Sequence, residues 1–274
     1  MKQDQMTQDQ TAIALTIAGS DSSGSAGIQA DLKTFGALGV HGTCVVAALT
    51  AQNTQSVEAI LPVPPEFVLA QMQAVASDID VRAIKIGMLA TRDNIEAVAE
   101  GLKHFGSAPV VLDPVMASHR GDPLIDESAV DTLKSVLMPR ATLITPNLFE
   151  AAMLLGEEKA RNADTMADQA RKLCGLGAKA VLVKGGHLDG EAIDVLSHDG
   201  GEERLEAPRH ETENTHGTGC TLSSAIAAGL AKGKPLTKAV KDAKVYVTAA
   251  IIAADELAVG KGRGPLHHFH ALWP

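Results

Sequence analysis

The sequence predicts an α/β protein with a mostly parallel central sheet and helices on both faces. Short, near-continuous apolar segments recur along the chain, as in strands that are buried on both sides. Longer amphipathic segments separate them, and several end on glycine, which favours the left-handed backbone that follows a helix. This repeated alternation predicts right-handed crossovers between parallel strands and therefore three layers of helix, sheet and helix.

Six apolar segments are expected to be parallel strands. They are "AIALTIAG" (12–19), "CVVAALT" (44–50), "AIKIGM" (83–88), "PVVLD" (109–113), "TLITP" (142–146) and "AVLVKGG" (180–186). After residue 186 the pattern changes. The segment "EAIDVLSHDGGEERLEAPR" (191–209) is expected to form a β-hairpin that turns at Asp199-Gly200-Gly201.

Eight amphipathic or small-residue segments are expected to be helices. They are "GIQADLKTFGALG" (27–39), "PEFVLAQMQAVASD" (65–78), "TRDNIEAVAEGLKHFG" (91–106), "DESAVDTLKSVLMP" (126–139), "NLFEAAMLLG" (147–156), "TMADQARKLCGLG" (165–177), "GCTLSSAIAAGLAKG" (219–233) and "LTKAVKDAKVYVTAAIIAADE" (236–256).

Length and composition favour one domain. A single α/β unit accommodates 274 residues, so we expect a polar, flexible tail over residues 1–11 and one domain over 12–274. The net charge of −9 argues against a nucleic acid or an anionic membrane as partner. No apolar leader and no membrane-spanning segment is found, and the three cysteines form no C-x-x-C pair. A reduced, cytoplasmic location is expected.

Polar and glycine-rich segments follow the predicted strands. In open parallel sheets, ligands bind beyond the carboxyl ends of the strands, so these segments are where a site is expected. They are "GSDSSGSAGIQAD" (19–31), "AQNTQSV" (51–57), "GMLA" (87–90), "DPVMASHRGDPL" (113–124), "PNLFEA" (146–151), "KGGH" (184–187) and "NTHGTGC" (214–220).

The last of these segments predicts an anion site. Gly217 and Gly219 allow the backbone to approach a ligand, and the helix that follows directs unpaired N–H groups and a partial positive charge outward. The γ-phosphoryl group of a nucleotide fits such a site. The alternative is a capped helix whose small residues pack on a neighbour. Neither the Walker pattern nor a G-x-G-x-x-G after the first strand is present.

Asp113, Asn147, Glu150 and Lys184 are candidate polar site residues. Asn147 and Glu150 are three positions apart, so they project from one helix face, where they can hold a hydrated Mg²⁺. The alternative is an ordinary helix start, with Asn147 as cap and Glu150 complementing the dipole. Lys184, at the end of a strand, either places a cation near phosphates or lies in solvent.

Eight motifs together closely resemble the hydroxymethylpyrimidine/phosphomethylpyrimidine kinases of thiamine biosynthesis, which have a ribokinase-like fold. The resemblance runs from Ile13 to the C-terminus, in order and at family spacing. The motifs are "TIAGSDSSGSAGIQADLKTFGALGVHGTCVVAALTAQNT" (16–54), "KIGML" (85–89), "VLDPVM" (111–116), "GDPLI" (121–125), "ITPNLFEA" (144–151), "VLVKGGH" (181–187), "NTHGTGCTLSSAIAAGLAKG" (214–233) and "GKGRGPLHHFH" (260–270).

The resemblance implies an ATP- and Mg²⁺-dependent kinase. Its expected substrates are 4-amino-5-hydroxymethyl-2-methylpyrimidine and the monophosphate of that pyrimidine, which becomes the diphosphate. A monovalent cation and a homodimer are also implied. Two other readings stay open: a pyridoxal kinase of the same fold, and a catalytically silent member that binds a ligand. Retention of Asp113, Asn147, Glu150, Lys184 and Cys220 argues against silence.

The resemblance also assigns roles to residues. Pyrimidine recognition falls on Gly19, Ala26, Asp31, Gln52, Met88 and Cys220. Nucleotide binding falls on Asp113, Asn147, Lys184, Thr215, Gly217 and Gly219. Magnesium, through water, falls on Asp113 and Glu150. Phosphoryl transfer falls on Lys184, Gly217, Thr218, Gly219 and Cys220.

Physical chemistry agrees with part of this assignment. The amide of Gln52 can match the donor and acceptor on the edge of an aminopyrimidine, and Met88 can lie against the ring. The alternatives are that Gln52 caps a loop and that Met88 fills the core.

Cys220 takes the place where related sugar kinases carry an aspartate as general base. A thiol at a helix N-terminus can have a lowered pKa, which makes a thiolate base available. Nearby phosphates oppose that ionisation, and a loose transition state asks little of a base. We expect Cys220 to shape the site and assist proton removal, while Lys184, Mg²⁺ and the amides of residues 217–219 supply most of the rate.

The chain departs from the family pattern in two places. The family has "DPSGGAG" where this chain has Ser22, Ser23 and Ser25, which should loosen the loop. His119 and Arg120 replace Lys-Ser in a flap that covers the substrate, and Arg120 can bind phosphate bidentately.

Overall fold

The computed structural model describes residues 11–116, 125, 127–186, 188 and 192–273. The tail expected over residues 1–11 lies outside this part of the chain except for Thr11. His119 and Arg120 of the expected flap also lie outside it.

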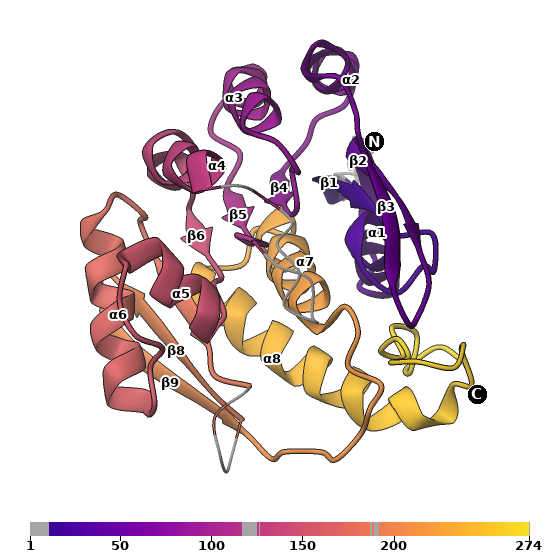
Figure 1. The fold of residues 1–274 in the computed structure, drawn as a ribbon, viewed down its shortest axis with the longest axis vertical. Coiled ribbons are helices and arrows are strands. Elements are labelled where there is room, and N and C mark those ends of the chain that lie inside the picture. The colour runs from indigo at the N-terminus through magenta and orange to yellow at the C-terminus, as the bar shows by residue number, and fades with distance from the viewer. Residues whose placement is uncertain (1–10, 117–124, 126, 187, 189–191, 274) are drawn as a thin grey trace, which may run out of the picture.

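In the described part of the chain, nine strands form one sheet in the order β3-β2-β1-β4-β5-β6-β7-β8-β9 (Figure 1). Their bounds are β1 (Ile13–Ser20), β2 (His41–Gln52), β3 (Val57–Pro62), β4 (Ala83–Ile86), β5 (Val110–Leu112), β6 (Leu143–Ile144), β7 (Val181–Lys184), β8 (Ala192–His198) and β9 (Gly201–Ala207). The six central strands, β2, β1, β4, β5, β6 and β7, pair in parallel. At the two edges of the sheet, β3 pairs antiparallel with β2, and β8 and β9 continue antiparallel from β7. The mostly parallel sheet is confirmed.

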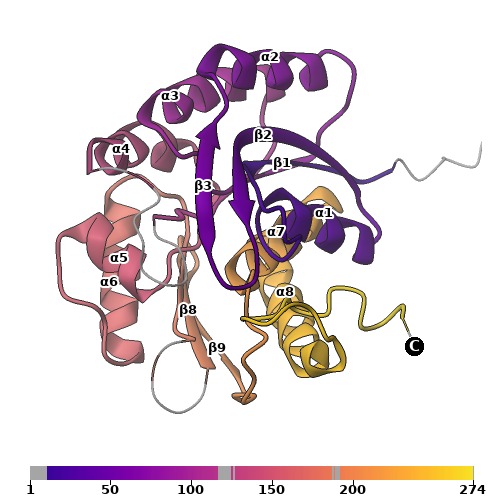
Figure 2. The ribbon, with the colours of Figure 1, turned by 45° about the vertical axis from the view of Figure 1, so that its right-hand side comes forward.

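Helices cover both faces of the sheet, as predicted. Their bounds are α1 (Gly27–Ala37), α2 (Pro65–Ala76), α3 (Arg92–Gly101), α4 (Glu127–Thr132), α5 (Leu148–Leu155), α6 (Ala163–Gly175), α7 (Thr218–Ala231) and α8 (Leu236–Ile252). Helices α2 to α6 share one core with the sheet, and α1, α7 and α8 share the other. Figures 1 and 2 show α2, α3 and α4 apart from α7 and α8, with strands between them.

The near-continuous apolar strands result from these two cores. In β1, Ala14 packs into the core with α7 and α8, while Leu15 and Ile17 pack into the core with α2 and α3. Because successive side chains of a strand point to opposite faces, a strand covered on both faces needs apolar residues at every position. Strand β5 follows the same rule, and β4 follows it except at Lys85; neither strand has an exposed residue.

Three local features bear on the sequence predictions. The hairpin at Asp199-Gly200-Gly201 is confirmed, since β8 and β9 pair across it. Strand β3 was not predicted because its residues are mostly exposed and show no apolar periodicity. The helix expected over 126–139 is interrupted: α4 ends at Thr132, and a π-helical turn and a 3₁₀ turn follow up to Arg140, with Pro139 unable to continue a helix.

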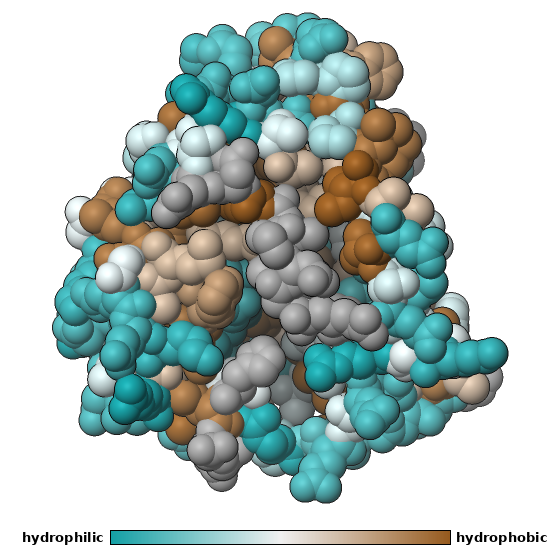
Figure 3. Space-filling model, in the orientation of Figure 1, coloured by the Kyte–Doolittle hydropathy of each residue, from teal (hydrophilic) through white to brown (hydrophobic). Residues whose placement is uncertain are grey.

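Exposed apolar side chains gather on the surface formed by β3 and α2. Apolar residues gather on the right of the face in Figure 3, where α2 and β3 lie in Figure 1. Leu61 of β3 is 64% exposed and Phe67 of α2 is 60% exposed. In the described residues, no helix has both the length and the apolar character needed to cross a bilayer.

Candidate active site

A cleft of about 1990 Å³ lies at the carboxyl ends of the parallel strands. Segments far apart in the sequence line it, as predicted from the fold class. All but one of the predicted site residues are on its wall: Gly19, Ala26, Gln52, Met88, Asp113, Asn147, Glu150, Lys184, Thr215, Gly217, Thr218, Gly219 and Cys220. The exception is Asp31.

Helix α7 presents its N-terminus to this cleft. Gly217 begins it with a left-handed backbone, φ 85°, and a Cβ there would lie 2.0 Å from the Ser25 carbonyl oxygen, so glycine is required. Among the described residues, no side chain caps the helix. Its first amides are therefore available to an anion. The predicted anion-binding geometry is present.

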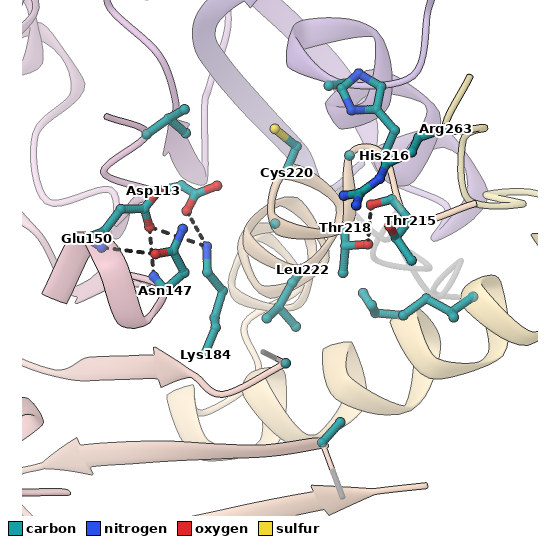
Figure 4. Close-up of a pocket in the computed structure, with 18 of the residues that line it drawn as sticks. Asp113, Asn147, Glu150, Lys184, Thr215, His216, Thr218, Cys220, Leu222 and Arg263 are labelled. Carbon is teal, nitrogen blue, oxygen red and sulfur yellow. Dashed lines mark hydrogen bonds and ion pairs between the residues drawn. The ribbon is translucent and has the colours of Figure 1, made fainter. Parts of the chain in front are cut away.

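Two carboxylates and a lysine lie beside this helix N-terminus (Figure 4). The Lys184 ammonium is 2.8 Å from Asp113 Oδ1 and 3.9 Å from Glu150 Oε2. A Cβ at Gly219 would lie 3.2 Å from Lys184 Nζ, so the cation also borders the helix mouth. Lys184 is therefore not a solvent lysine, since it is held between the acids and the amides.

The three charges perturb one another. Burial acts to raise the pKa of Asp113, but Lys184 and Lys85 outweigh it and hold that pKa below its ordinary value. Burial, together with repulsion from Asp113, raises the pKa of Glu150 to about 7 although Lys184 opposes the shift. Burial acts to lower the pKa of Lys184, but Asp113 and Glu150 keep it above its ordinary value.

Asn147 and Glu150 form a capping box at the start of α5. Asn147 Oδ1 accepts hydrogen bonds from the Phe149 and Glu150 amides, and Glu150 Oε2 accepts one from the Asn147 amide at 2.7 Å. The helix-start alternative is thus realised. It does not remove these residues from the site, since both still line the cleft.

The donor set suits a magnesium ion held through water and phosphate. Carboxylate and amide oxygens are the ligands of Mg²⁺, which keeps several waters when it binds protein. The Lys184 ammonium bonds Asp113 Oδ1, so that oxygen is already engaged. Within the described residues, no group of three or more His, Cys, Asp or Glu side chains forms a ready metal cage. Water-mediated contact with Asp113 and Glu150 fits this geometry.

Cys220 lies in the first turn of α7 and lines the cleft. Burial raises the pKa of its thiol to about 11, and the opposing effect of Lys85 is smaller. The helix N-terminus therefore does not produce the thiolate that the sequence made available. Cys220 is a neutral thiol on the wall of the cleft.

Asp31, to which the resemblance assigns pyrimidine recognition, lies beneath the cleft and not among the residues that line it. It is fully buried, and its two oxygens both accept hydrogen bonds from the Lys85 ammonium, at 2.8 and 2.9 Å. Thr16 of β1 and Ser224 of α7 also donate to it, at 2.6 and 2.7 Å. Asp31 therefore ties β1, β4 and α7 together, and Lys85 is the member of the pair that borders the cleft.

Gly19, Ala26, Gln52 and Met88 line the same cleft. A Cβ at Gly19 would lie 2.5 Å from Met88 Cε, so the thioether side chain packs directly over that glycine. The Gly19 amide also donates to the Met88 carbonyl at 3.0 Å. Met88 therefore brings an apolar side chain to the lining of the cleft, and Gln52 brings a polar one.

Three polar residues of this region were not predicted: Asp21, Lys85 and His216. Asp21 and His216 line the cleft and are 3.3 Å apart, Asp21 Oδ2 to His216 Nε2. Their positions gave a signal, since Asp21 follows β1 directly and His216 immediately precedes Gly217. The signal for Lys85 was weaker: it is a charged residue inside the apolar segment "AIKIGM".

Comparison with known proteins gives a family. The family model described as phosphomethylpyrimidine kinase matches residues 21–267. The chain belongs to this family. The hydroxymethylpyrimidine/phosphomethylpyrimidine kinase of Rhizobium meliloti is 58% identical over 264 residues, covering 96% of this chain and 99% of the relative.

Solved structures agree with this family of kinases. An ADP complex of Bacillus subtilis pyridoxal kinase has a TM-score of 0.87 and 39% identity, covering 95% of this chain and 98% of that one. Phosphomethylpyrimidine kinase from Clostridium difficile has a TM-score of 0.79 and 44% identity, covering 88% and 100%. The ribokinase-like fold and the assignment as a kinase are confirmed.

The serines that depart from the family pattern lie in a hydrogen-bonded loop. Ser22 Oγ accepts from the backbone amide of Gln52 at 2.8 Å, which connects the loop to the end of β2. The Asp21 carboxylate accepts from the amides of Ser23, Ser25 and Ala26 and from the Ser23 hydroxyl.

Proposed function

We propose that this kinase phosphorylates 4-amino-5-hydroxymethyl-2-methylpyrimidine, and then its monophosphate, with ATP and Mg²⁺. The observation that carries the proposal is the shared cleft. An open helix N-terminus flanked by Lys184 and two carboxylates adjoins a wall of Gly19, Met88 and Gln52. The first side suits a phosphoryl group and the second suits a flat nitrogen heterocycle.

The residues of the α7 N-terminus stabilise the transferring phosphoryl group. Its transition state spreads negative charge over the equatorial oxygens, so donors that are fixed beforehand lower the barrier. The amides of Gly219 and Cys220 and the Lys184 ammonium are such donors, and Thr215 and Thr218 border them. Mg²⁺, when bound, neutralises charge on the phosphate oxygens, and Asp113 and Glu150 would hold it through water.

Cys220 positions the accepting hydroxyl and is not an essential base. A thiol with a pKa of about 11 is protonated at neutral pH. A loose phosphoryl-transfer transition state has little bonding to the attacking oxygen, so that oxygen gains little positive charge and its proton can leave late. In this proposal Gln52 and Met88 orient the pyrimidine, and the N-terminus of α7 stabilises the phosphoryl group that the pyrimidine hydroxyl attacks.

The proposal is tested by an assay of ADP release with three acceptors offered separately. These are the hydroxymethylpyrimidine, its monophosphate and pyridoxal. Turnover with both pyrimidines supports the proposal. No turnover with any acceptor would favour a ligand-binding protein.

Pyridoxal kinase is the second candidate. The observation that favours it is the likeness to the Bacillus subtilis pyridoxal kinase, which covers nearly the whole of both chains. Turnover with pyridoxal alone would establish it in place of the first proposal.

A homodimer and a monovalent cation are further proposals of the same account. The exposed apolar residues Leu49, Leu61 and Phe67, close to the edge strand β3, support association of two copies. Light scattering on the purified chain measures the first, and turnover in potassium, sodium and tetramethylammonium salts measures the second.

A further inference from the structure

A chain of side-chain contacts connects the α7 N-terminus to Gln52. His216 Nε2 lies 3.1 Å from Nε2 of the Gln52 side chain and 3.3 Å from Asp21 Oδ2. Gln52 Oε1, the other end of that side-chain amide, lies 3.2 Å from Thr50 Oγ1. Asp21 and His216 are 3% and 8% exposed, so these contacts are shielded from water.

The proton of Thr50 determines one end of the Gln52 amide. Thr50 Oγ1 is 2.8 Å from the Ser20 carbonyl oxygen, which can only accept, and a hydroxyl has one proton. Thr50 therefore donates to Ser20 and must accept from Gln52. The partners therefore favour the reverse of this orientation, with the NH₂ group of Gln52 toward Thr50 and its carbonyl oxygen toward His216, because the two ends of the amide are nearly isosteric and are assigned by their partners.

Asp21 determines the other end independently. Burial acts to raise the pKa of Asp21, but hydrogen bonds from His216 and Ser23 lower it to about 2. The ionised carboxylate accepts only, so His216 Nε2 must carry a proton. A protonated Nε2 has no lone pair to accept a hydrogen bond from the Gln52 NH₂ group, so the carbonyl oxygen is the end of the amide that fits beside it. Both arguments give the same amide orientation.

We propose that His216 is a positioning residue that fixes the Gln52 amide in this orientation and so determines which heterocycle the cleft accepts. The inference rests on the proposed function, in which Gln52 reads the edge of an aminopyrimidine. On that edge a donor amino group stands beside an acceptor ring nitrogen. Only one orientation of an amide makes both hydrogen bonds, and the reversed amide opposes donor to donor and acceptor to acceptor.

His216 also lies next to the phosphoryl side of the cleft. His216 is adjacent to Gly217, whose Cα approaches the Ser25 carbonyl so closely that no side chain fits. The Asp21 carboxylate holds the loop that includes Ser25 and Ala26. The heterocycle side and the phosphoryl side of the cleft therefore meet at Asp21 and His216.

The test compares His216→Leu with His216→Gln, because glutamine keeps a distal N–H donor. For His216→Leu we expect KM for the hydroxymethylpyrimidine to rise roughly tenfold, as one or two lost hydrogen bonds imply. We expect KM for ATP to rise less than KM for the pyrimidine, and preference over pyridoxal to fall. His216→Gln should recover most of the affinity. An unchanged pyrimidine KM, or a parallel rise in KM for ATP, would overturn the inference.

Nuclear magnetic resonance of the unaltered protein provides a measurement that does not depend on the variants folding. Long-range ¹H–¹⁵N spectra report which ring nitrogen of His216 is protonated. A proton on Nε2 is expected, and a bare Nε2 would contradict the inference. Failure of the proposed function is distinguishable, because it would appear as absent turnover and absent calorimetric binding of the pyrimidine by the unaltered protein.

Discussion

Two buried lysines beside the same cleft have different surroundings. Lys85 is fully buried and its ammonium bonds both oxygens of Asp31, which are also held by Thr16 and Ser224. Lys184 is 14% exposed, bonds one oxygen of Asp113 and approaches Glu150 at 3.9 Å. The first pair is saturated by protein groups. The second keeps capacity for a ligand.

The comparison shows that one kind of ion pair, a buried lysine with an aspartate, can serve either structure or function. Burial acts to lower the pKa of each lysine, and neighbouring acids raise it above its ordinary value in both cases. What differs is where the remaining donors face. Both lysines line the cleft, but Lys85 is fully buried with its ammonium on both oxygens of Asp31, whereas Lys184 is 14% exposed and lies beside the open α7 N-terminus. Stability should therefore depend on Lys85, and turnover on Lys184.

Replacing Lys85 should have the largest effect. Lys85→Met leaves the Asp31 carboxylate buried without its counter-charge, and the free energy of unfolding should fall by about 3–5 kcal/mol. The double variant Lys85→Met/Asp31→Asn should recover most of it. Urea denaturation measures both. Equal stability of the single and double variants would show that the pair does not act as one unit.

Replacing Lys184 should affect turnover instead. Lys184→Met removes a donor beside the phosphoryl site, so kcat should fall roughly 10²–10³-fold. The unfolding free energy should fall less than for Lys85→Met, because Asp113 retains Lys85 nearby and is reached by water through the cleft. Lys103→Met, at an exposed surface ion pair with Glu100, is the control. Steady-state kinetics with the hydroxymethylpyrimidine measure the effect, and an unchanged kcat would place the phosphoryl group elsewhere.

His268 is a buried titratable group that, unlike the two lysines, has no acidic partner among its contacts in the described part of the chain. Burial lowers the pKa of His268 to about 4, and its Nε2 contacts Thr221 at 3.0 Å. The unfolded chain binds a proton near the ordinary pKa of about 6.5, so stability is full above that pH and falls as pH drops toward 4. The fall should reach about 3 kcal/mol.

Denaturation between pH 4 and pH 8 measures this dependence. His268→Gln should flatten the profile over that window, and His104→Gln, at an exposed position, should not. A profile unchanged by His268→Gln would show that another group supplies the pH dependence.

Cys220 should have the smallest effect, although both lysines act on it. Cys220→Ala should lower kcat only a few fold, since a thiol with a pKa of about 11 is a poor base at neutral pH. The measurement is kcat with saturating pyrimidine and ATP. A loss of a thousandfold or more would show that Cys220 is an essential base and contradict the expectation that Lys184 contributes more to kcat than Cys220 does.

Most of the fold was predictable because the strands are covered on both faces. The alternation of "AIKIGM" and its neighbours with amphipathic segments gave the parallel sheet. Strand β3 was not predictable, since its exposed residues pair with β2 through backbone groups that no side-chain pattern records. The interruption after Thr132 likewise depends on packing in a segment whose periodicity favours one helix.

The site was predictable at strand ends and not beneath them. Asp113, Lys184 and Gly217 follow from the rule that ligands bind at the carboxyl edge of the sheet. The burial of Asp31 did not follow, because its partner Lys85 is 54 residues away and Ser224 is 193 away. The contacts of His216 with Gln52 and Asp21 also join distant segments, so only the folded chain reveals them.

The most direct measurement is a crystal structure with a non-hydrolysable ATP analogue and the hydroxymethylpyrimidine bound together. We expect the γ-phosphate within hydrogen-bonding distance of the Gly219 and Cys220 amides and of Lys184. We expect the pyrimidine against Met88 and Gln52, with its hydroxymethyl oxygen facing the phosphorus. Ligands bound far apart, or an α7 N-terminus filled by protein side chains, would contradict the account.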